Sequence, residues 1–302
     1  MLAAVALAGG IGATADQQPV FRDRVDLVNV GVTVIDRKGS LVTGLAREDF
    51  QVLEDGREQT VRYFASGEVD QDHSTELHLG VLLDVSGSMA EDISFMRTAS
   101  IRFLNTLLDA ADITLVDFDT EIRVARYGQR DFARLVERIR QQQLGTYTAM
   151  YDAIGVYLDG AAEQQGRKVM LLYTDGGDTR SALGFNDLLD LLKASDVTVH
   201  AIGAFNRRRG AAGQLEQPRL TEIAEVTGGQ VYFPSSVKEL DKVYGQIRSE
   251  IRAQYTLGYV SANDKTDGAW RKVEIKLTNP AARDLKLRSR KGYFAPFRKQ
   301  AK

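Results

Sequence analysis

The fold of this chain is indicated by residues 77–89, LHLGVLLDVSGSM. An almost unbroken apolar run ends abruptly in an acid, two hydroxyls and a glycine. Such a run suits a strand buried on both faces in the middle of a parallel sheet. We therefore expect its polar end to lie at the carboxyl edge of that sheet, where open α/β sheets bind their ligands.

Three oxygen-bearing side chains follow this strand at alternate positions: Asp84, Ser86 and Ser88. In an extended or gently turning loop, this spacing can bring three oxygens to one point. Oxygen ligands without sulfur or imidazole favour a hard divalent cation such as Mg²⁺. The alternative interpretation is a polar turn that caps a helix, because Ser and Asp also favour that role.

Three segments together resemble the von Willebrand factor A (vWA) domain. Residues 84–88, DVSGS, resemble the Asp-x-Ser-x-Ser motif of its metal-ion-dependent adhesion site (MIDAS). Residues 145–154, GTYTAMYDAI, look like the threonine loop and following helix of the family. Residues 168–177, KVMLLYTDGG, look like its apolar strand ending in Thr-Asp-Gly. One short motif is weak evidence, but three in order form a specific match.

The resemblance implies a role for five residues in metal binding. Ser86, Ser88 and Thr148 are expected to bind the metal directly or through water. Thr148 is preferred over Thr146 because it lies five residues before Ala153, as the family spacing requires. Asp84 and Asp175 then act largely through bridging waters. The expected ion is Mg²⁺ or Mn²⁺, with Ca²⁺ as a further candidate, and its open position accepts a partner's carboxylate.

Apolar patterns along the middle of the chain alternate between strands and helices. The alternation predicts a doubly wound, mostly parallel α/β sheet, the Rossmann-like vWA fold, over residues 76–252. Helices are predicted around 93–107, 132–139, 150–162, 188–192 and 220–226, and from 237 onward. The stretch 206–217, with its arginines and small residues, is predicted to be an exposed loop.

The two ends of the chain read as β structure. Residues 20–70 contain β-branched runs and an Asp55-Gly56 hairpin signal, and 253–297 contain alternating segments. Each end holds too few strands to form a stable sheet alone. We therefore expect both to pack together as one smaller β domain beside the vWA core. Residues 45–56 also resemble the amino-terminal region of a group of bacterial exported vWA-related proteins.

The first residues of the chain bear on where the protein is located relative to the cell. Residues 1–19 contain a small apolar stretch, and Ala13-Thr14-Ala15 fits a signal-peptidase site, but no basic region precedes them. The segment is interpreted as a signal peptide whose start lies upstream, with a disordered tail as the alternative. Export to a periplasmic or extracellular location is predicted. No stretch approaches about 18 uninterrupted apolar residues, so no transmembrane helix is expected.

Composition excludes several classes of site. The chain of 302 residues has no cysteine, which excludes disulfides and thiolate chemistry. Its 39 basic and 41 acidic residues give no electrostatic reason to expect nucleic acid. Asp117-Phe118-Asp119 is too short a motif to indicate a site. His200, within an apolar strand, is expected to be a core histidine with its hydrogen bonds satisfied.

Three functions fit this pattern. The favoured one is a non-enzymatic adhesion or scaffold module that binds a partner's Asp or Glu through the MIDAS cation. The second is a metal-dependent hydrolase that uses the cation as a Lewis acid. The only acids near the motif, Asp84 and Asp175, are assigned to the metal, which disfavours the enzyme. The third is a structural vWA domain with an empty site.

Overall fold

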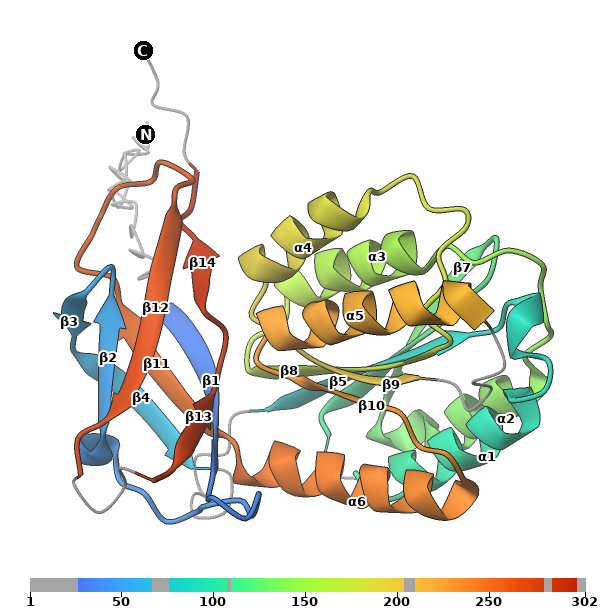
Figure 1. The fold of residues 1–302 in the computed structure, drawn as a ribbon, viewed down its shortest axis with the longest axis horizontal. Coiled ribbons are helices and arrows are strands. Elements are labelled where there is room, and N and C mark those ends of the chain that lie inside the picture. Colours follow the sequence, from blue (N-terminus) through green and yellow to red (C-terminus); the bar gives the residue numbers. More distant parts are fainter. Residues whose placement is uncertain (1–26, 67–75, 108–109, 204–209, 280–283, 298–302) are drawn as a thin grey trace, which may run out of the picture.

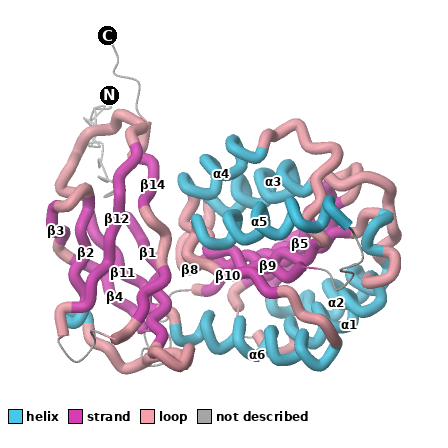
Figure 2. Tube along the Cα trace, viewed as in Figure 1, coloured by secondary structure: helices cyan, strands magenta, loops and turns pink. Residues whose placement is uncertain are grey.

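The computed structural model describes residues 27–66, 76–107, 110–203, 210–279 and 284–297. Two parts lie side by side in Figure 1: a helix-covered central sheet and a sandwich of two smaller sheets. Figure 2 shows the same arrangement, with the helices confined almost entirely to the first part. Within the described residues, no helix has the length and apolar character needed to span a membrane.

The central sheet has six strands in the order β10-β9-β8-β5-β6-β7. All neighbouring strands are parallel except β6 and β7, which are antiparallel. The strands are β5 (Leu77–Asp84), β6 (Asp112–Phe118), β7 (Ile122–Gly128), β8 (Arg167–Thr174), β9 (Thr198–Gly203) and β10 (Gln230–Tyr232). All eight residues of β5 are buried. This confirms the predicted doubly wound, mostly parallel sheet.

Helices cover both faces of this sheet (Figure 1). One face carries α1 (Ile93–Leu104), α2 (Phe132–Gln141) and α6 (Val237–Ala253), and the other carries α3 (Met150–Ala162), α4 (Phe185–Ala194) and α5 (Gly210–Val226). Each layer has its own apolar core. Val81 and Leu83 of β5 pack into the first core, and Leu82 packs into the second. Successive strand side chains point to opposite faces, so a continuous apolar run is what this central strand requires.

The sandwich joins the two ends of the chain. One sheet has the order β13-β1-β11-β4 and the other the order β14-β12-β2-β3. Its strands are β1 (Leu27–Ile35), β2 (Phe50–Glu54), β3 (Arg57–Gln59), β4 (Val61–Ser66), β11 (Tyr255–Val260), β12 (Trp270–Leu277), β13 (Lys286–Arg288) and β14 (Gly292–Phe294). Because β1 pairs with β11 and β2 pairs with β12, neither end completes a sheet alone. The predicted smaller β domain is confirmed.

A buried carboxylate holds the two ends together inside the sandwich. Glu54 is 3% exposed and accepts hydrogen bonds from the hydroxyls of Tyr259 at 2.9 Å, Tyr293 at 2.8 Å and Ser261 at 2.5 Å. A buried carboxylate is costly unless its oxygens are satisfied, and three donors satisfy this one. The predicted domain limits at residues 70, 76 and 252 stay predictions, and the segment 1–19 lies outside the described residues.

The sandwich contacts the amino edge of the central sheet through arginines. Arg290 donates from Nη1 to the carbonyl of Ser195, just after α4, at 2.9 Å. Arg288 donates from Nε to the carbonyl of Gly228 at 3.0 Å and also pairs with Glu250 of α6. Because β5, β8 and β9 run parallel away from this edge, their carboxyl ends lie on the opposite side from the sandwich.

The loop predicted for residues 206–217 is wrong over most of its length. Helix α5 begins at Gly210, and residues 206–209 lie outside the described part of the chain. The Ala, Gln, Leu and Glu residues here favour a helix, and Leu220 and Ile223 bury its apolar face against the sheet. The glycines and Pro218, which lies inside the helix, had favoured a loop.

Candidate metal centre

The first loop of the predicted site follows β5 directly. Ser86 and Ser88 lie around a short 3₁₀ turn (η2, Gly87–Met89), and their Oγ atoms are 2.9 Å apart. The Ser86 N–H donates to Oδ1 of Asp84 at 2.9 Å. Asp84 is completely buried and Ser86 is 1% exposed, whereas Ser88 is exposed. The loop therefore leads from a buried carboxylate to an accessible hydroxyl.

Asp84 has an unusual electrostatic environment. Burial raises the pKa of its carboxyl to about 6, and the nearby charge of Asp175 acts in the same direction. Hydrogen bonds from Ser86 and Thr174 act the other way, because they stabilise the ionised form. No Lys, Arg or His of the described chain forms an ion pair with Asp84. An incoming cation would supply the positive charge that this carboxylate lacks.

The second loop lies against the first. The N–H of Gly145 donates to the carbonyl of Val85 at 2.8 Å. A Cβ at Gly87 would meet the carbonyl oxygen of Gly145 at 3.2 Å, so the two loops are in close contact there. Thr148 is 5% exposed, whereas Thr146 is exposed and its Oγ1 lies 3.2 Å from that of Thr120. This difference favours Thr148 over Thr146, and its role in metal binding stays a prediction.

The third loop completes the arrangement. The N–H groups of Thr179 and Arg180 donate to the carbonyl of Thr148 at 2.9 and 3.0 Å, and the Thr148 N–H donates to Oγ1 of Thr179 at 3.0 Å. Asp175 begins this loop and its Oδ1 accepts the N–H of Gly177 at 3.1 Å. Hydrogen bonds thus join the loops that carry all five predicted site residues.

The residues present fit a small hard cation. Neighbouring ligands of an octahedral Mg²⁺ ion with bonds of about 2.1 Å lie about 3 Å apart. The 2.9 Å separation of the Ser86 and Ser88 hydroxyls matches that spacing. In the described residues, no three His, Cys, Asp or Glu side chains are grouped to hold a metal. A cation here would therefore depend on hydroxyl ligands, with Asp84 and Asp175 supplying negative charge.

Thr174 is a residue that the sequence analysis did not assign to the site. It is fully buried at the end of β8, and its hydroxyl donates to Oδ2 of Asp84 at 2.6 Å. Oγ1 of Thr174 also accepts the Gly176 N–H at 3.1 Å. Thr174 therefore fixes the orientation of the Asp84 carboxylate and links two neighbouring strands. The signal in the sequence was its place in the Thr-Asp-Gly end of residues 168–177, after an otherwise apolar strand.

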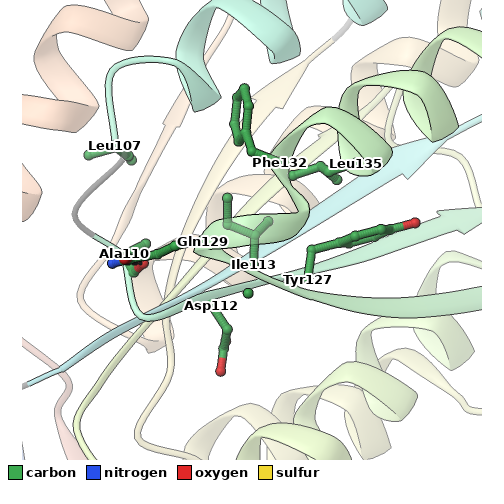
Figure 3. A pocket seen from close by; sticks show the side chains of 9 residues that line it. Leu107, Ala110, Asp112, Ile113, Tyr127, Gln129, Phe132 and Leu135 are labelled. Carbon is green, nitrogen blue, oxygen red and sulfur yellow. Dashed lines mark hydrogen bonds between the residues drawn. The ribbon is translucent and has the colours of Figure 1, made fainter.

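An apolar cavity of about 210 Å³ lies elsewhere, at the amino edge of the central sheet. Figure 3 shows Ile113, Tyr127, Phe132 and Leu135 around it, while the Asp112 carboxylate points away from them. Asp112 instead approaches Nδ1 of His78 at 3.1 Å. None of the five predicted site residues lines this cavity.

Comparison with known proteins agrees with the fold. A model of the von Willebrand factor type A domain matches residues 78–246, which is more than half of the chain. The chain belongs to the von Willebrand factor type A domain family. The predicted family is confirmed, and the three loops that carry Asp84, Thr148 and Asp175 all fall within the matched part of this vWA protein.

Individual relatives of the vWA protein are distant. The uncharacterized protein YwmC of Bacillus subtilis (strain 168) is 26% identical over 207 residues, which cover 61% of this chain and 88% of YwmC. The pilus adhesin SpaC of Lactobacillus rhamnosus GG, in its open conformation, has a TM-score of 0.51 and 11% identity, covering 86% of this chain and 49% of SpaC. A likeness at this identity shows the fold alone, and the chain corresponds to about half of SpaC.

Proposed function

We propose that this vWA protein is a metal-dependent binding module that recognises an Asp or Glu side chain of a protein partner. The observation that carries the proposal is the pair of hydroxyls, Ser86 and Ser88, 2.9 Å apart beside the buried Asp84 carboxylate. Ser86, Ser88 and Thr148 would hold Mg²⁺ or Mn²⁺, and Asp84 and Asp175 would act through water. When bound, the cation supplies an electrophilic position for the partner's carboxylate.

The surface beside the loops supports a protein partner. Leu144 is 42% exposed and Tyr147 is 58% exposed, and both belong to the second loop. Aromatic and aliphatic side chains of this kind are common where proteins bind one another. The shared fold with a pilus adhesin is consistent with a binding role. The proposal assigns no catalytic residue.

Metal titration tests the proposal directly. Isothermal titration with Mg²⁺, Mn²⁺ and Ca²⁺ is expected to show one site in the intact protein and none in Asp84→Ala. Asp187→Ala serves as a control, because Asp187 lies at the exposed start of α4, where it accepts the Gly184 N–H. Equal ion binding by the intact and Asp84→Ala proteins would show that the site is assigned wrongly. Metal-dependent turnover of a phosphoester or peptide would replace the binding role with a hydrolytic one.

We also propose that the protein is exported, as the apolar segment and Ala-x-Ala pattern in residues 1–19 indicate. Cell fractionation of the full-length protein tests this, with a cytoplasmic enzyme as the fractionation control. Recovery of the protein only with the cytoplasmic enzyme would contradict export.

A further inference from the structure

Strand β7 differs from the other strands at the sheet edges of the described chain. Of these edge strands, β3, β10, β13 and β14 have only three residues each. β4 has six residues, but its pairing with β11 is interrupted by a register shift at Gly258. β7 has seven residues, Ile122–Gly128, and pairs with β6 without interruption. Short length and bulges are common ways to protect a sheet edge, and β7 has neither.

The backbone of β7 presents hydrogen-bonding groups on its outer side. Ile122 lies opposite Phe118 in the register with β6. The Phe118 carbonyl points away from β7, because it accepts the Val85 N–H at 2.9 Å. This pair therefore exchanges no hydrogen bonds, and such pairs alternate with hydrogen-bonded ones along an antiparallel ladder. The N–H and C=O groups of Ile122, Val124 and Arg126 thus face away from β6, where no other described strand pairs with them.

The two arginines of β7 do not protect this edge. Charged side chains and proline often prevent a further strand from pairing with an edge strand. β7 contains no proline or lysine. Arg123 lies over β6, where its Nε donates to Asp117 at 2.5 Å. Arg126 lies against α3, where its Nη2 donates to the Gly160 carbonyl at 3.3 Å. Both guanidinium groups are therefore held beside the sheet faces by contacts within the chain.

Exposed valines follow the same edge on the side of α3. Val124 is 49% exposed, and Val156 of α3 is 45% exposed. Both elements run toward the amino edge of the sheet, since β7 is antiparallel to β6 and α3 leads into the parallel strand β8. From the contact between Arg126 and Gly160, two residues back along β7 cover about 6.6 Å and four residues back along α3 cover about 6 Å. Val124 and Val156 therefore lie at the same level and form an apolar strip beside the unpaired backbone groups.

We infer that β7 pairs antiparallel with β7 of a second copy of the chain, across a two-fold axis at Val124. Such a dimer joins two identical edges through main-chain hydrogen bonds. The sequence of β7 complements itself in this register, because Val124 packs on Val124 of the second copy and Ile122 lies opposite Arg126. An axis one residue earlier would place Arg123 opposite Arg123, and an axis one residue later would leave Val124 opposite Arg126. The valine strip and the charges therefore favour a second copy in this register.

The dimer extends the six-stranded sheet of each copy into one continuous sheet. Because the two β7 strands run in opposite directions, the carboxyl edges of the two copies face opposite ways. On the proposed function, the dimer would present its metal centres at opposite ends and could hold two partners at once. The pairing itself uses no residue of the metal centre, so it can be tested without metal.

Sedimentation equilibrium of the full chain in EDTA tests the pairing. The intact protein is expected to show a monomer–dimer equilibrium over a concentration series. Val124→Lys should raise the dimer dissociation constant about tenfold, because two like charges then meet at the axis. Val124 is half exposed, so the variant should retain its fold, which circular dichroism checks. Leu191→Lys is the matched control and should dimerise as the intact protein does, because Leu191 is 40% exposed on α4, which packs against α3 and α5.

Single introduced cysteines report the register, because the chain has no cysteine of its own. Val124→Cys should form a disulfide-linked dimer under mild oxidation. Residues of a hydrogen-bonded antiparallel pair have Cα atoms about 5.5 Å apart, which a disulfide can span. Leu191→Cys is the control for random collisions and should remain a monomer on a denaturing gel.

The outcomes decide the inference independently of the metal centre. A monomer mass at every concentration, or equal dissociation constants for Val124→Lys and the intact protein, would overturn it. Equal cross-linking of the two cysteine variants would place the contact elsewhere and overturn the edge pairing. Loss of Mg²⁺ binding with an intact dimer would contradict only the metal centre, and the dimer would stand.

Discussion

Both edges of the central sheet bury charged groups, but Asp84 at the carboxyl edge is satisfied differently from the paired acids at the amino edge. At the amino edge, Nζ of Lys168 lies 2.7 Å from both carboxylate oxygens of Asp196, and Arg288 of the sandwich pairs with Glu250. At the carboxyl edge, Asp84 is bonded by the Thr174 hydroxyl and the Ser86 N–H. Acids at the first edge have cations of this chain as partners, whereas Asp84 has only neutral donors.

This difference indicates that the two edges have different roles in stability and binding. An acid paired within the chain contributes to the stability of the fold, and removing its partner leaves an uncompensated charge. A buried acid bonded only by neutral groups stays costly in its ionised form, as the raised pKa of Asp84 shows. We therefore expect substitutions of the paired groups at the amino edge to change stability, and those around Asp84 at the carboxyl edge to change ligand binding.

The largest effect is expected from Lys168→Met. The substitution leaves Asp196 without its closest cation. Breaking a buried pair costs about 3–5 kcal/mol, and because the Asp196 side chain is 31% exposed the loss should lie at the lower end of that range. Lys193→Met is the matched control, because it breaks the more exposed pair with Asp190 and should cost less than about 1 kcal/mol. Urea denaturation measures both. Equal losses of stability in the two variants would mean that the ion pair at the amino edge contributes no more to folding than an exposed ion pair does.

The pH dependence of stability should reveal two opposing groups. Burial lowers the pKa of His200 to about 3, and its Nδ1 has no partner among the described residues, so this core histidine is not satisfied as predicted. Below pH 6.5 the unfolded chain binds a proton at His200 that the folded chain does not bind. Each unit by which the pH falls in this range therefore lowers the free energy of unfolding by about 1.4 kcal/mol. Asp84 has the opposite effect. Between about pH 6 and 3.8 the folded chain binds a proton at Asp84 that the unfolded chain does not bind, so the free energy of unfolding rises as the pH falls.

Two variants separate these contributions. Relative to the intact protein in EDTA, His200→Leu should become more stable as the pH falls from 6 to 4, by about 3 kcal/mol in total. Asp84→Asn should become less stable over the same range, by about 2 kcal/mol. Urea denaturation at several pH values checks both. Parallel curves for all three proteins would contradict the assignment.

A smaller loss is expected when the sandwich is detached from the amino edge at one point. Arg290→Met removes the hydrogen bond to the Ser195 carbonyl, and bonds from charged donors contribute about 1.5–3 kcal/mol. The net loss should be smaller, about 1–2 kcal/mol, because burial already lowers the pKa of this guanidinium and its Nε has no partner among the described residues. Hydrogen exchange should show faster opening of β14. Arg62→Met, at an exposed position of β4, is the control and should change neither measurement.

The smallest change in stability is expected from the double variant Ser86→Ala with Ser88→Ala. It removes both partners of the Ser86–Ser88 hydrogen bond, and Asp84 keeps the Ser86 N–H and the Thr174 hydroxyl as donors, so the free energy of unfolding should change by about 1 kcal/mol or less. Divalent-ion binding should nevertheless be lost. Calorimetry and urea denaturation on the same sample measure the two quantities. Unfolding of the variant would instead favour a purely structural turn.

Much of the architecture could be predicted from local patterns. The apolar run of β5, the limits of α3 at Met150 and Ala162, and the paired β ends all follow from side-chain periodicity and strand number. The loop predicted for 206–217 failed because glycine and proline were given more weight than the apolar face of the helix. The periodicity of apolar residues indicates which side of a helix or strand is buried. This pattern can be read from residues that are close together in the sequence.

The sequence by itself determined the order of strands and helices, the vWA motifs and the five candidate metal residues. Only the tertiary structure decided what surrounds them. The bond from Thr174 to Asp84 joins residues 90 positions apart, and that from Arg290 to Ser195 joins residues 95 apart. That the Gln142 carboxamide has no hydrogen-bond partner among the described residues is likewise visible only once its neighbours are in place. Such contacts depend on how distant strands and loops pack in space, and no local pattern of residues encodes that distance.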